Sequence, residues 1–573
     1  MMQEEIRKKI KKVLEKLQLP EVDFVVESTE DEKMGDYATN VAMVLARQAG
    51  KNPMELAEDI KNEIANSKNE LIEKVEVAGP GFINFFLKPE VFLKNIEEVL
   101  KVGDDYGKNK NLKGKKIMVE YTDPNVMKPF HIGHLMTNAV GESISRLVEF
   151  SGAQVKRANY YSDAGLALAK AVWGMMDLKQ EMPEESADIV TKTDFLGKAY
   201  AHGVKQSEER PDVAEEIKTI NKKIYDRSDE SILALYDTGK HWSLEHFEIL
   251  YAKLGSTFDY LIAETSVAPE GLRIVRENVG KVFEQSEGAI VFHGEKFDPT
   301  LHTRVFINKE GLSTYEAKEL ALNKKKFTLF NFDQSLVFTG NEQNDYFRVI
   351  LKAIEQLWPE IALRTKHFGH GMLRLPDGKM SSRKGNAITG ESLIADVEKL
   401  AREKMLTSTH LSTGEQSKVA TEIAVGAIKY SILKQAIGKD IIFDFEKSLS
   451  FEGDSGPYLQ YTHARCCSLL AKGKEAHLEA KLSREARLPE AVLRLLERFS
   501  NEVVRAHQEY APQKICTYLI ELASAFNAYY AQNQIINVED KETSECRLAL
   551  TQAVGAVLKN GLWLLGTKAP ERM

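Results

Sequence analysis

The clearest alternation of apolar and polar positions lies between residues 116 and 161. Ile117 to Tyr121 is a short apolar run that predicts a buried strand, and Asp123-Pro124-Asn125 has the composition of a turn. Apolar residues then recur at helical spacing from Gly133 to Phe150, and Val155 to Tyr161 predicts a second strand. This order predicts a βαβ unit whose loops converge on one edge of a parallel sheet.

The rest of the chain divides into further segments. Residues 1–112 predict an N-terminal α+β module, which includes a helical stripe made of Ile6, Ile10, Val13, Leu14 and Leu17. Residues 113–405 predict an α/β core of the Rossmann type, with a charged helical insertion at about 175–258. After the insertion, Phe258 to Tyr260 and Ala289 to Phe292 again predict strands. Residues 406–573 show helical stripes throughout. We therefore expect a multidomain α/β protein with a C-terminal all-helical bundle.

Composition narrows the class of protein. A chain of 573 residues with 43% hydrophobic and 28% charged residues has the balance of an ordinary globular protein, and is too long for one core. No apolar run approaches the roughly 20 residues that span a bilayer, and the N-terminus lacks a signal-peptide core, so we expect a cytoplasmic protein with no membrane partner. The four cysteines form no CxxC pair, and we expect neither zinc nor another metal held by protein ligands alone. The net charge of -8 argues against nonspecific coating of nucleic acid.

The first candidate for chemistry is the sequence His131-Ile132-Gly133-His134, at the start of the predicted helix. A strand, a tight turn and a helix start direct backbone amides toward a bound anion. Gly133 leaves room for a flat group such as adenine, and the two histidines can donate hydrogen bonds to phosphate oxygens. This arrangement suits a nucleoside triphosphate. The alternatives for this motif alone are two surface histidines or half of a metal site.

The second candidate is the basic loop from Asp377 to Asn386, which holds two lysines, an arginine and two serines between glycines. Such a loop can close on a triphosphate, although in isolation it would be interpreted as a solvated basic turn. The two motifs together are far more specific than either one.

The two motifs resemble the HIGH and KMSKS signatures of class I aminoacyl-tRNA synthetases. Residues 120–134 resemble the arginyl-tRNA synthetase version, as do residues 34–40, 79–84 and 456–465, so the resemblance covers nearly the whole chain. It implies activation of L-arginine by ATP, accompanied by Mg²⁺, and transfer of the arginyl group to the terminal ribose of tRNA(Arg). It also implies that the N-terminal module contacts tRNA and that the helical bundle binds the anticodon. We expect a monomer.

The resemblance assigns roles to individual residues. Catalysis is implied for His131, His134, Lys128, Lys379 and Lys384. ATP contacts are implied for His131, Gly133, His134, Lys379, Met380, Ser381 and Ser382. Arginine contacts are implied for Glu120, Asn125, Tyr315, Glu319 and Gln343. The chain departs from the family pattern twice, because Ser382 stands in place of the second lysine of KMSKS and Glu319 stands where aspartate is more common.

Three alternatives stay open. Another class I specificity would share both motifs. A nucleotidylyltransferase of cofactor synthesis also uses an HxGH turn, but those enzymes are typically one small domain without a helical C-terminal region. A catalytically inactive relative that binds RNA would have no reason to keep both histidines and the basic loop.

Overall fold

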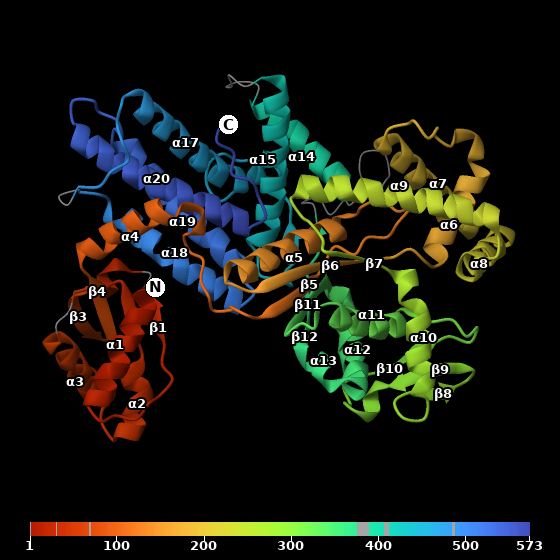
Figure 1. Ribbon diagram of the computed structural model, residues 1–573, viewed down its shortest axis with the longest axis horizontal. Helices are drawn as coiled ribbons and strands as arrows, with labels where there is room; N and C mark the ends of the chain where they lie inside the picture. The colour runs from red at the N-terminus through yellow and green to blue at the C-terminus, as the bar shows by residue number, and fades with distance from the viewer. Residues whose placement is uncertain (1, 30, 68–69, 375–388, 406–411, 484–486) are drawn as a thin grey trace.

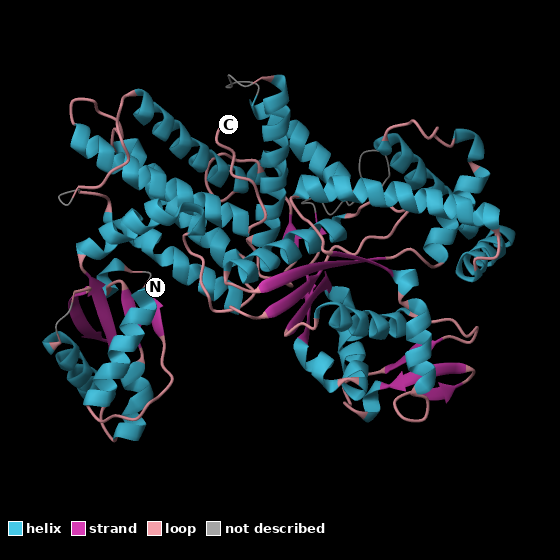
Figure 2. Ribbon diagram, viewed as in Figure 1, coloured by secondary structure: helices cyan, strands magenta, loops and turns pink. Residues whose placement is uncertain are grey.

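A computed structural model describes residues 2–29, 31–67, 70–374, 389–405, 412–483 and 487–573. The predicted basic loop, with Lys379, Met380, Ser381, Ser382 and Lys384, lies outside the described residues. At the centre is a five-stranded parallel sheet in the order β12-β11-β5-β6-β7 (Figure 1, Figure 2). Its strands are β5 (Lys116–Glu120), β6 (Gln154–Tyr161), β7 (Tyr260–Ala263), β11 (Gln334–Gly340) and β12 (Thr365–His370).

The strand order creates a place where a ligand can bind. The chain enters at β5, adds β6 and β7 on one side, and then crosses over to place β11 and β12 on the other side. Loops that leave β5 and β11 therefore turn to opposite faces of the sheet and open a crevice between them. The predicted Rossmann-type core is confirmed by this topology.

The sheet is covered on both faces because its pleat sends alternate side chains in opposite directions. Ile117 and Val119 of β5 belong to the large apolar core that includes helix α5 (Ile132–Phe150). Met118 lies between them and belongs to a second core. Four helices contribute to that second core, namely α10 (Ala268–Glu277), α11 (Tyr315–Phe330), α12 (Asn344–Leu357) and α13 (Pro359–Arg364).

Two insertions widen the sheet domain. Between β6 and β7 lie α6 (Leu166–Asp177), α7 (Ile189–Glu209), α8 (Pro211–Asp226) and α9 (Glu230–Leu254), where the sequence predicts helices. Between β7 and α11 lie α10 (Ala268–Glu277) and an antiparallel sheet made of β8 (Glu284–Ser286), β9 (Ala289–His293) and β10 (Thr303–Ile307). The sequence indicated only β9 of these three strands.

The N-terminal module has the predicted α+β character. Its helices are α1 (Met2–Lys16), α2 (Val41–Ala49), α3 (Pro53–Asn66) and α4 (Pro89–Val102). Its antiparallel sheet has the order β1-β2-β4-β3, made of β1 (Val26–Ser28), β2 (Tyr37–Thr39), β4 (Phe82–Leu87) and β3 (Ile72–Ala78).

The C-terminal region is a helical bundle beside this module (Figure 1). Its helices are α14 (Gly390–Met405), α15 (Thr413–Leu433), α16 (Phe445–Ser448), α17 (Gly456–Glu475), α18 (Glu490–Gln508), α19 (Gln513–Gln532) and α20 (Lys541–Leu564). One short strand interrupts it, β14 (Ile441–Ile442), which pairs with β13 (Leu373–Arg374). Within the described part of the chain, no helix combines the length and apolar character needed to cross a membrane.

The N-terminal module docks on α18 through buried polar contacts. The Tyr37 hydroxyl lies 2.6 and 2.8 Å from the two carboxyl oxygens of Glu497, and the Asn501 amide donates to the same hydroxyl at 2.7 Å. Beside them, Arg494 forms an ion pair with Asp36. Residues 34–40, which the sequence singled out, therefore serve as a docking segment. Burial raises the pKa of Glu497 to about 7.

This buried carboxyl predicts a pH-dependent stability. Its pKa is about 7 in the folded protein against 4.5 as the ordinary value, so only the folded state keeps the proton between those two pH values. The contribution of Glu497 to the stability of the folded state therefore falls as the pH rises from 4.5 to about 7, and it is least favourable above pH 7. We expect Glu497→Gln, which keeps an acceptor for Tyr37, to raise Tm at pH 8.5 by about 2 °C or more.

The gain should shrink as the pH is lowered toward 5, where the wild-type carboxyl is already protonated. Thermal unfolding followed at several pH values measures this, with Glu509→Gln just beyond α18 as the control. An equal shift of Tm at every pH would contradict the prediction.

Candidate active site

A cavity of about 360 Å³ lies at the crevice between β5 and β11. It is lined by the start of α5 and by loops that follow β5, β11 and β12. Its polar lining residues include Thr122, Asp123, Asn125, His131, His134, Thr137, Thr339, Glu342, Gln343 and His370. Both predicted histidines, together with Gly133, Asn125 and Gln343, are therefore brought to one site.

The two histidines cap the start of α5 for each other. His131 Nδ1 accepts a hydrogen bond from the His134 backbone N–H at 3.3 Å, and His134 Nδ1 accepts from the His131 backbone N–H at 3.3 Å. Their rings stack with centroids 3.4 Å apart. This is the reciprocal pattern of a capping box, made here by two imidazoles. Because each Nδ1 accepts, the proton of each neutral ring must be on Nε2.

The surroundings keep both rings neutral. Burial lowers the pKa of His134 well below its ordinary value, and the neighbouring His131 and Lys128 lower it further. His131 is more exposed, but partial desolvation and then the charge of Lys128 also lower its pKa. A Cβ at Gly133 would lie 3.0 Å from the His131 ring, so a larger residue there would displace that ring. The site therefore offers two neutral Nε2–H donors at a helix N-terminus, where the backbone dipole favours anions.

Lys128 lies in a second, larger cavity of about 1000 Å³ that shares His131 with the first. This cavity is lined by α7, α9 and the start of α14, with Lys198 and Lys205 among its basic residues. The Lys128 ammonium lies 5.2 Å from the centre of the Tyr200 ring. Burial, and then Lys170, lower the pKa of Lys128.

The predicted arginine contacts divide into two groups. Asn125 and Gln343 line the crevice, whereas Glu120 and Glu319 are buried together beneath it. Glu120 forms an ion pair with the buried Lys326, with an N to O distance of 2.7 Å. Asn323 donates to Glu319 at 2.9 Å, and burial, then the negative charge of Glu120, raise the pKa of Glu319 to about 7. The Asp123 carboxyl also interacts with Glu120, Lys326 and Glu319, and burial, then the charge of Glu120, raise its pKa well above its ordinary value. The cluster therefore holds three carboxyl groups and one lysine.

Tyr315 lies apart from that cluster. It is 61% exposed at the start of α11, and the ammonium of Lys318 lies 5.2 Å from its ring centre. Lys318 itself is buried and forms an ion pair with Glu264 at 2.5 Å. Tyr315 is thus next to a further buried carboxylate, that of Glu264, and we call Glu120, Glu319 and Glu264 together the acidic region.

The predicted site residues do not include several side chains of this region. Glu264 follows β7 and His370 ends β12, and Glu342 lies in the 3-10 turn η6 (Asn341–Gln343) after β11. A usable signal was present, because polar residues at the carboxyl ends of parallel strands meet at one edge of a sheet. Applying it to Glu264 required the correct end of β7, which the sequence pattern placed too early.

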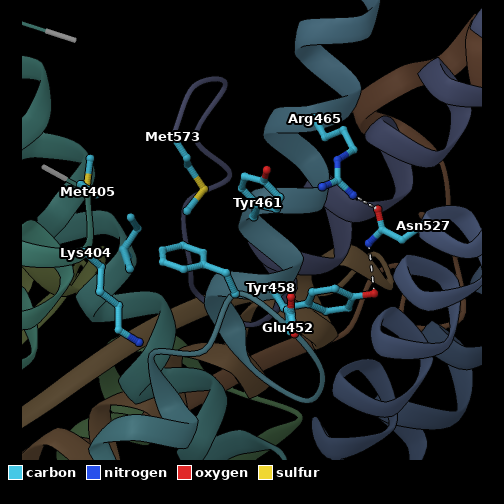
Figure 3. A pocket seen from close by; sticks show the side chains of 10 residues that line it. Lys404, Met405, Glu452, Tyr458, Tyr461, Arg465, Asn527 and Met573 are labelled. Carbon is cyan, nitrogen blue, oxygen red and sulfur yellow. Dashed lines mark hydrogen bonds between the residues drawn. The ribbon is translucent and has the colours of Figure 1, made fainter. Parts of the chain in front are cut away.

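The bundle has a cavity of its own, of about 450 Å³. Figure 3 shows the side chains that line it, among them Tyr458, Tyr461, Arg465, Asn527 and the C-terminal Met573. The Arg465 guanidinium lies 4.8 Å from the centre of the Tyr461 ring, and Asn527 donates to the Tyr458 hydroxyl at 3.0 Å. Aromatic faces next to a guanidinium and an amide suit a planar polar group such as a nucleobase. We call this cavity the base pocket.

Comparison with known proteins shows to which family of enzymes the chain belongs. Residues 95–445 match the family described as tRNA synthetases class I (R), catalytic domain, and residues 459–573 match the DALR anticodon binding domain. The chain therefore belongs to the class I aminoacyl-tRNA synthetases. Residues 4–87 match the Arginyl tRNA synthetase N terminal domain. Since the relatives below agree with this match, the chain belongs to the arginyl-tRNA synthetase family, whose members are arginine–tRNA ligases.

Two of the similar proteins are arginine–tRNA ligases of known sequence. The one from Clostridium perfringens is 31% identical over 569 residues, which cover 97% of each chain. The one from Pyrococcus furiosus is 29% identical over 646 residues and covers 100% of each chain. Among solved structures, the arginyl-tRNA synthetase of Thermus thermophilus superposes with a TM-score of 0.79 at 23% identity, covering 100% of each chain. This last comparison supports the fold.

Proposed function

We propose that the crevice carries out both steps of the arginyl-tRNA synthetase reaction, with ATP bound between the start of α5 and the ends of β11 and β12. In the first step the carboxylate of L-arginine attacks the α-phosphorus of ATP, and pyrophosphate leaves. In the second step the terminal ribose of tRNA(Arg) takes the arginyl group. The observation that carries this proposal is the pair of neutral, mutually capped histidines at the cavity wall.

The residues act by alignment and by neutralising charge, without a covalent nucleophile. Nε2–H of His131 and of His134 would donate to phosphate oxygens while negative charge builds on the leaving pyrophosphate. Lys128, Lys379 and Lys384 would add positive charge. Gly133, Met380, Ser381 and Ser382 would complete the ATP contacts.

Mg²⁺ would arrive with ATP. Among the described residues no group of three or more His, Cys, Asp or Glu side chains could hold a metal ion. Phosphate oxygens and water are the usual Mg²⁺ ligands at such sites. The Glu342 carboxyl lines the same cavity and would be a protein oxygen ligand, whereas burial and the charge of Glu120 raise the pKa of Asp123 and disfavour its ionised form. The ion would neutralise phosphate charge when it is bound.

The histidine proposal predicts opposite effects of two substitutions at position 134. Asparagine can place an acceptor where Nδ1 is, so His134→Asn should keep the cap of α5 and lose the Nε2 donor. Its rate of arginine activation should fall by about 10²-fold or more, the range for removing one preorganised donor. His134→Gln can place an amide N–H near the Nε2 position, and should retain more activity at the cost of the cap.

Pyrophosphate exchange with saturating tRNA measures the rate, and thermal unfolding measures the cap. If His134→Asn keeps full exchange activity while folded, His134 is a structural cap and the phosphate role is rejected.

Arginine would bind with its guanidinium toward the acidic region. A guanidinium presents five donors in one plane and pairs well with carboxylates. Glu120 and Glu319 share a single lysine, so one more cation would balance the cluster. Asn125 and Gln343 would contact the amino and carboxylate end of the substrate from the crevice. Tyr315 would cover the guanidinium side from the rim.

This assignment predicts a pH-dependent effect of Glu319→Gln. Above pH 7 Glu319 is ionised, so removing its charge should lower kcat/KM for arginine by roughly 30-fold or more, the effect of losing one partner of a desolvated pair worth about 2 to 5 kcal/mol. At pH 6 the wild-type carboxyl is largely protonated, and the loss should be smaller. The KM for ATP should stay unchanged.

Aminoacylation kinetics at pH 6 and 8.5, with arginine and ATP varied separately, make the test. Glu316→Gln on the same helix, which breaks only the pair with Arg304, is the control. A loss of arginine specificity below threefold at pH 8.5 would mean that the counter-charge for the guanidinium lies elsewhere.

Transfer RNA would engage two regions. The base pocket would receive an anticodon base, since it lies in the matched DALR domain and has the chemistry of a nucleobase site. The second cavity, with Lys128, Lys198 and Lys205, opens beside His131 and would guide the 3′ end toward the adenylate. A monomer in the cytoplasm, with the N-terminal module as a further tRNA contact, remains our expectation.

The base pocket predicts a selective loss of tRNA affinity. Stacking of one base on an aromatic ring is worth about 1–3 kcal/mol, so Tyr461→Leu should raise KM for tRNA by roughly 5-fold to 150-fold. The KM values for ATP and arginine should not change. Tyr530→Leu is the matched control, because Tyr530 contacts Arg465 from outside the lining and has similar exposure. If the two variants have the same KM for tRNA, the proposal that an anticodon base binds in this pocket is wrong.

A further inference from the structure

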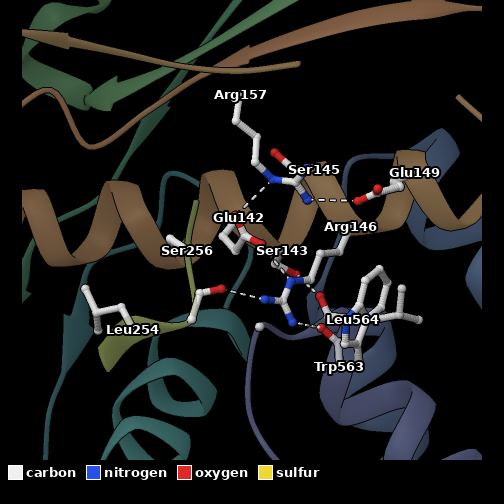
Figure 4. Close-up of polar contacts among 12 residues, drawn as sticks. Glu142, Ser143, Ser145, Arg146, Glu149, Arg157, Leu254, Ser256, Trp563 and Leu564 are labelled. Atoms are coloured by element: carbon white, nitrogen blue, oxygen red, sulfur yellow. Dashed lines mark hydrogen bonds and ion pairs between the residues drawn. The ribbon is translucent and has the colours of Figure 1, made fainter. Parts of the chain in front are cut away.

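A buried polar junction joins α5 to the ends of two other helices, away from the crevice (Figure 4). Arg146 of α5 donates to the carbonyl of Gly255, just after α9, at 2.6 Å, and to the carbonyl of Trp563, in the last turn of α20, at 2.8 Å. Ser143 donates to the carbonyl of Leu564 at 2.8 Å. Carbonyls at helix ends lack partners within the helix, so α5 supplies partners for two helix ends at once.

A lysine from a fourth helix completes the junction. Lys429 of α15 is fully buried, and its ammonium donates to the carbonyls of Leu254 at 2.7 Å and Gly566 at 3.0 Å. These groups belong to the ends of the same two helices. The C-terminus of a helix carries partial negative charge, so two converging C-termini make a suitable place for two cations, the buried Lys429 and the partly buried Arg146.

One carboxylate balances this positive charge. Glu142 of α5 is buried and accepts from Arg146 at 2.7 Å, from Arg157 at 3.2 Å and from the Tyr121 hydroxyl at 2.5 Å. Lys429 has no direct bond to it and is held by carbonyl groups. These contacts therefore depend on geometry, because each one forms only when the end of α9 or α20 is in the correct position.

The junction lies between the two sites already described. Along α5, Glu142 is about 12 Å from His134 at 1.5 Å per residue. In the other direction, Gly566 begins the tail that ends at Met573 in the base pocket. The tail is tied to α17, where Gln460 donates to the Lys568 carbonyl at 2.9 Å and His463 Nδ1 lies 3.0 Å from the Pro570 carbonyl.

We propose that Lys429 and Arg146 are positioning residues, which set where α5 lies against the C-terminal tail and so transmit occupancy of the base pocket to His131 and His134. The proposal rests on the proposed function of the base pocket as an anticodon site. A base that orders Met573 would order the tail, and the carbonyls that Lys429 and Arg146 hold would keep α5 in its active placement.

Protonation of Lys429 supports this role. Burial lowers its pKa to about 7; Arg146 and Lys568 act in the same direction, and Glu142 opposes them. The ammonium form holds both carbonyls more strongly than the neutral amine, so the coupling should weaken as pH rises from 6.5 to 8.5. Arginine at this position would stay charged across that range.

The test compares aminoacylation kinetics of wild type, Lys429→Met, Lys429→Arg and a control. The control is Lys253→Met, which removes a lysine near the end of α9 that pairs with Glu398 on the surface side. Each enzyme is assayed with tRNA(Arg) and with the same tRNA carrying one altered anticodon base, at pH 6.5 and 8.5. We expect the altered base to lower the wild-type kcat at pH 6.5 by about tenfold, within the usual range of coupling between sites.

In Lys429→Met, kcat with the natural tRNA should fall by about the same factor, and the altered base should then cost less than twofold in kcat. Lys429→Arg should keep the effect of the base and lose its pH dependence, and Lys253→Met should behave as wild type. If Lys429→Met lowers kcat equally with both tRNAs, the junction is only structural and the proposal is wrong.

Two further outcomes separate the proposals. If the altered base raises only KM in wild type, the base pocket keeps its function and the coupling is rejected. If the altered base and Tyr461→Leu both have no effect, the proposed function of the base pocket fails. If Lys429→Met does not fold, the variant Arg146→Lys tests the proposal instead. It keeps the positive charge, but the shorter lysine cannot contact Glu142, Gly255 and Trp563 together. An unchanged effect of the base on kcat in that variant would overturn the proposal.

Discussion

The placement of α5 is the constraint on which the other parts of this protein depend. Its start is fixed by two imidazoles that cap each other, and this cap determines which ring nitrogen is available to a ligand. Its later turns carry Ser143 and Arg146 to the ends of α9 and α20. A single helix thus links the crevice, the helical insertion and the bundle. The position of the two histidines in its first turn therefore depends on the contacts that hold its later turns.

The sites differ in how they treat buried charge. At the crevice, desolvation lowers the pKa of both histidines and so favours the neutral form, in which each ring has one N–H donor. Beneath it, Glu120 and Glu319 keep an excess of acceptors over the single lysine. Unpaired buried carboxyl groups destabilise a fold, and a protein retains them where a ligand supplies the missing partner. The imbalance therefore favours a cationic substrate, whereas neutral donors favour an anionic one, and L-arginine with ATP meets both requirements.

Local patterns predicted much of this architecture. The βαβ unit around α5 was predicted because strand, turn and helix follow one another within 50 residues and each has its own period. The strand expected at Phe258 to Tyr260 begins instead at Tyr260, because Phe258 packs against Tyr121 and Tyr251 as a loop residue. Because the strand was predicted to end at Tyr260, Glu264 was not recognised as the residue that follows it. Partners distant in sequence, such as Lys326 for Glu120 or Glu497 for Tyr37, leave no periodic signal at all.

Three buried groups with pKa values near 7 lie at contacts between different parts of the molecule. Glu497 lies where the N-terminal module meets the bundle, Lys429 where the bundle meets α5, and Glu319 where α11 meets the acidic cluster. Each is buried mainly among carbonyls, amides or like charges, and an apolar residue at each place would avoid the desolvation of a charge. Apolar packing accepts many nearly equivalent arrangements, whereas a buried polar group is satisfied only when its partners are in register. Such contacts lower the stability of the fold somewhat, but they define how the domains and helices are placed relative to one another. An enzyme that must align ATP, an amino acid and a long RNA needs this defined placement.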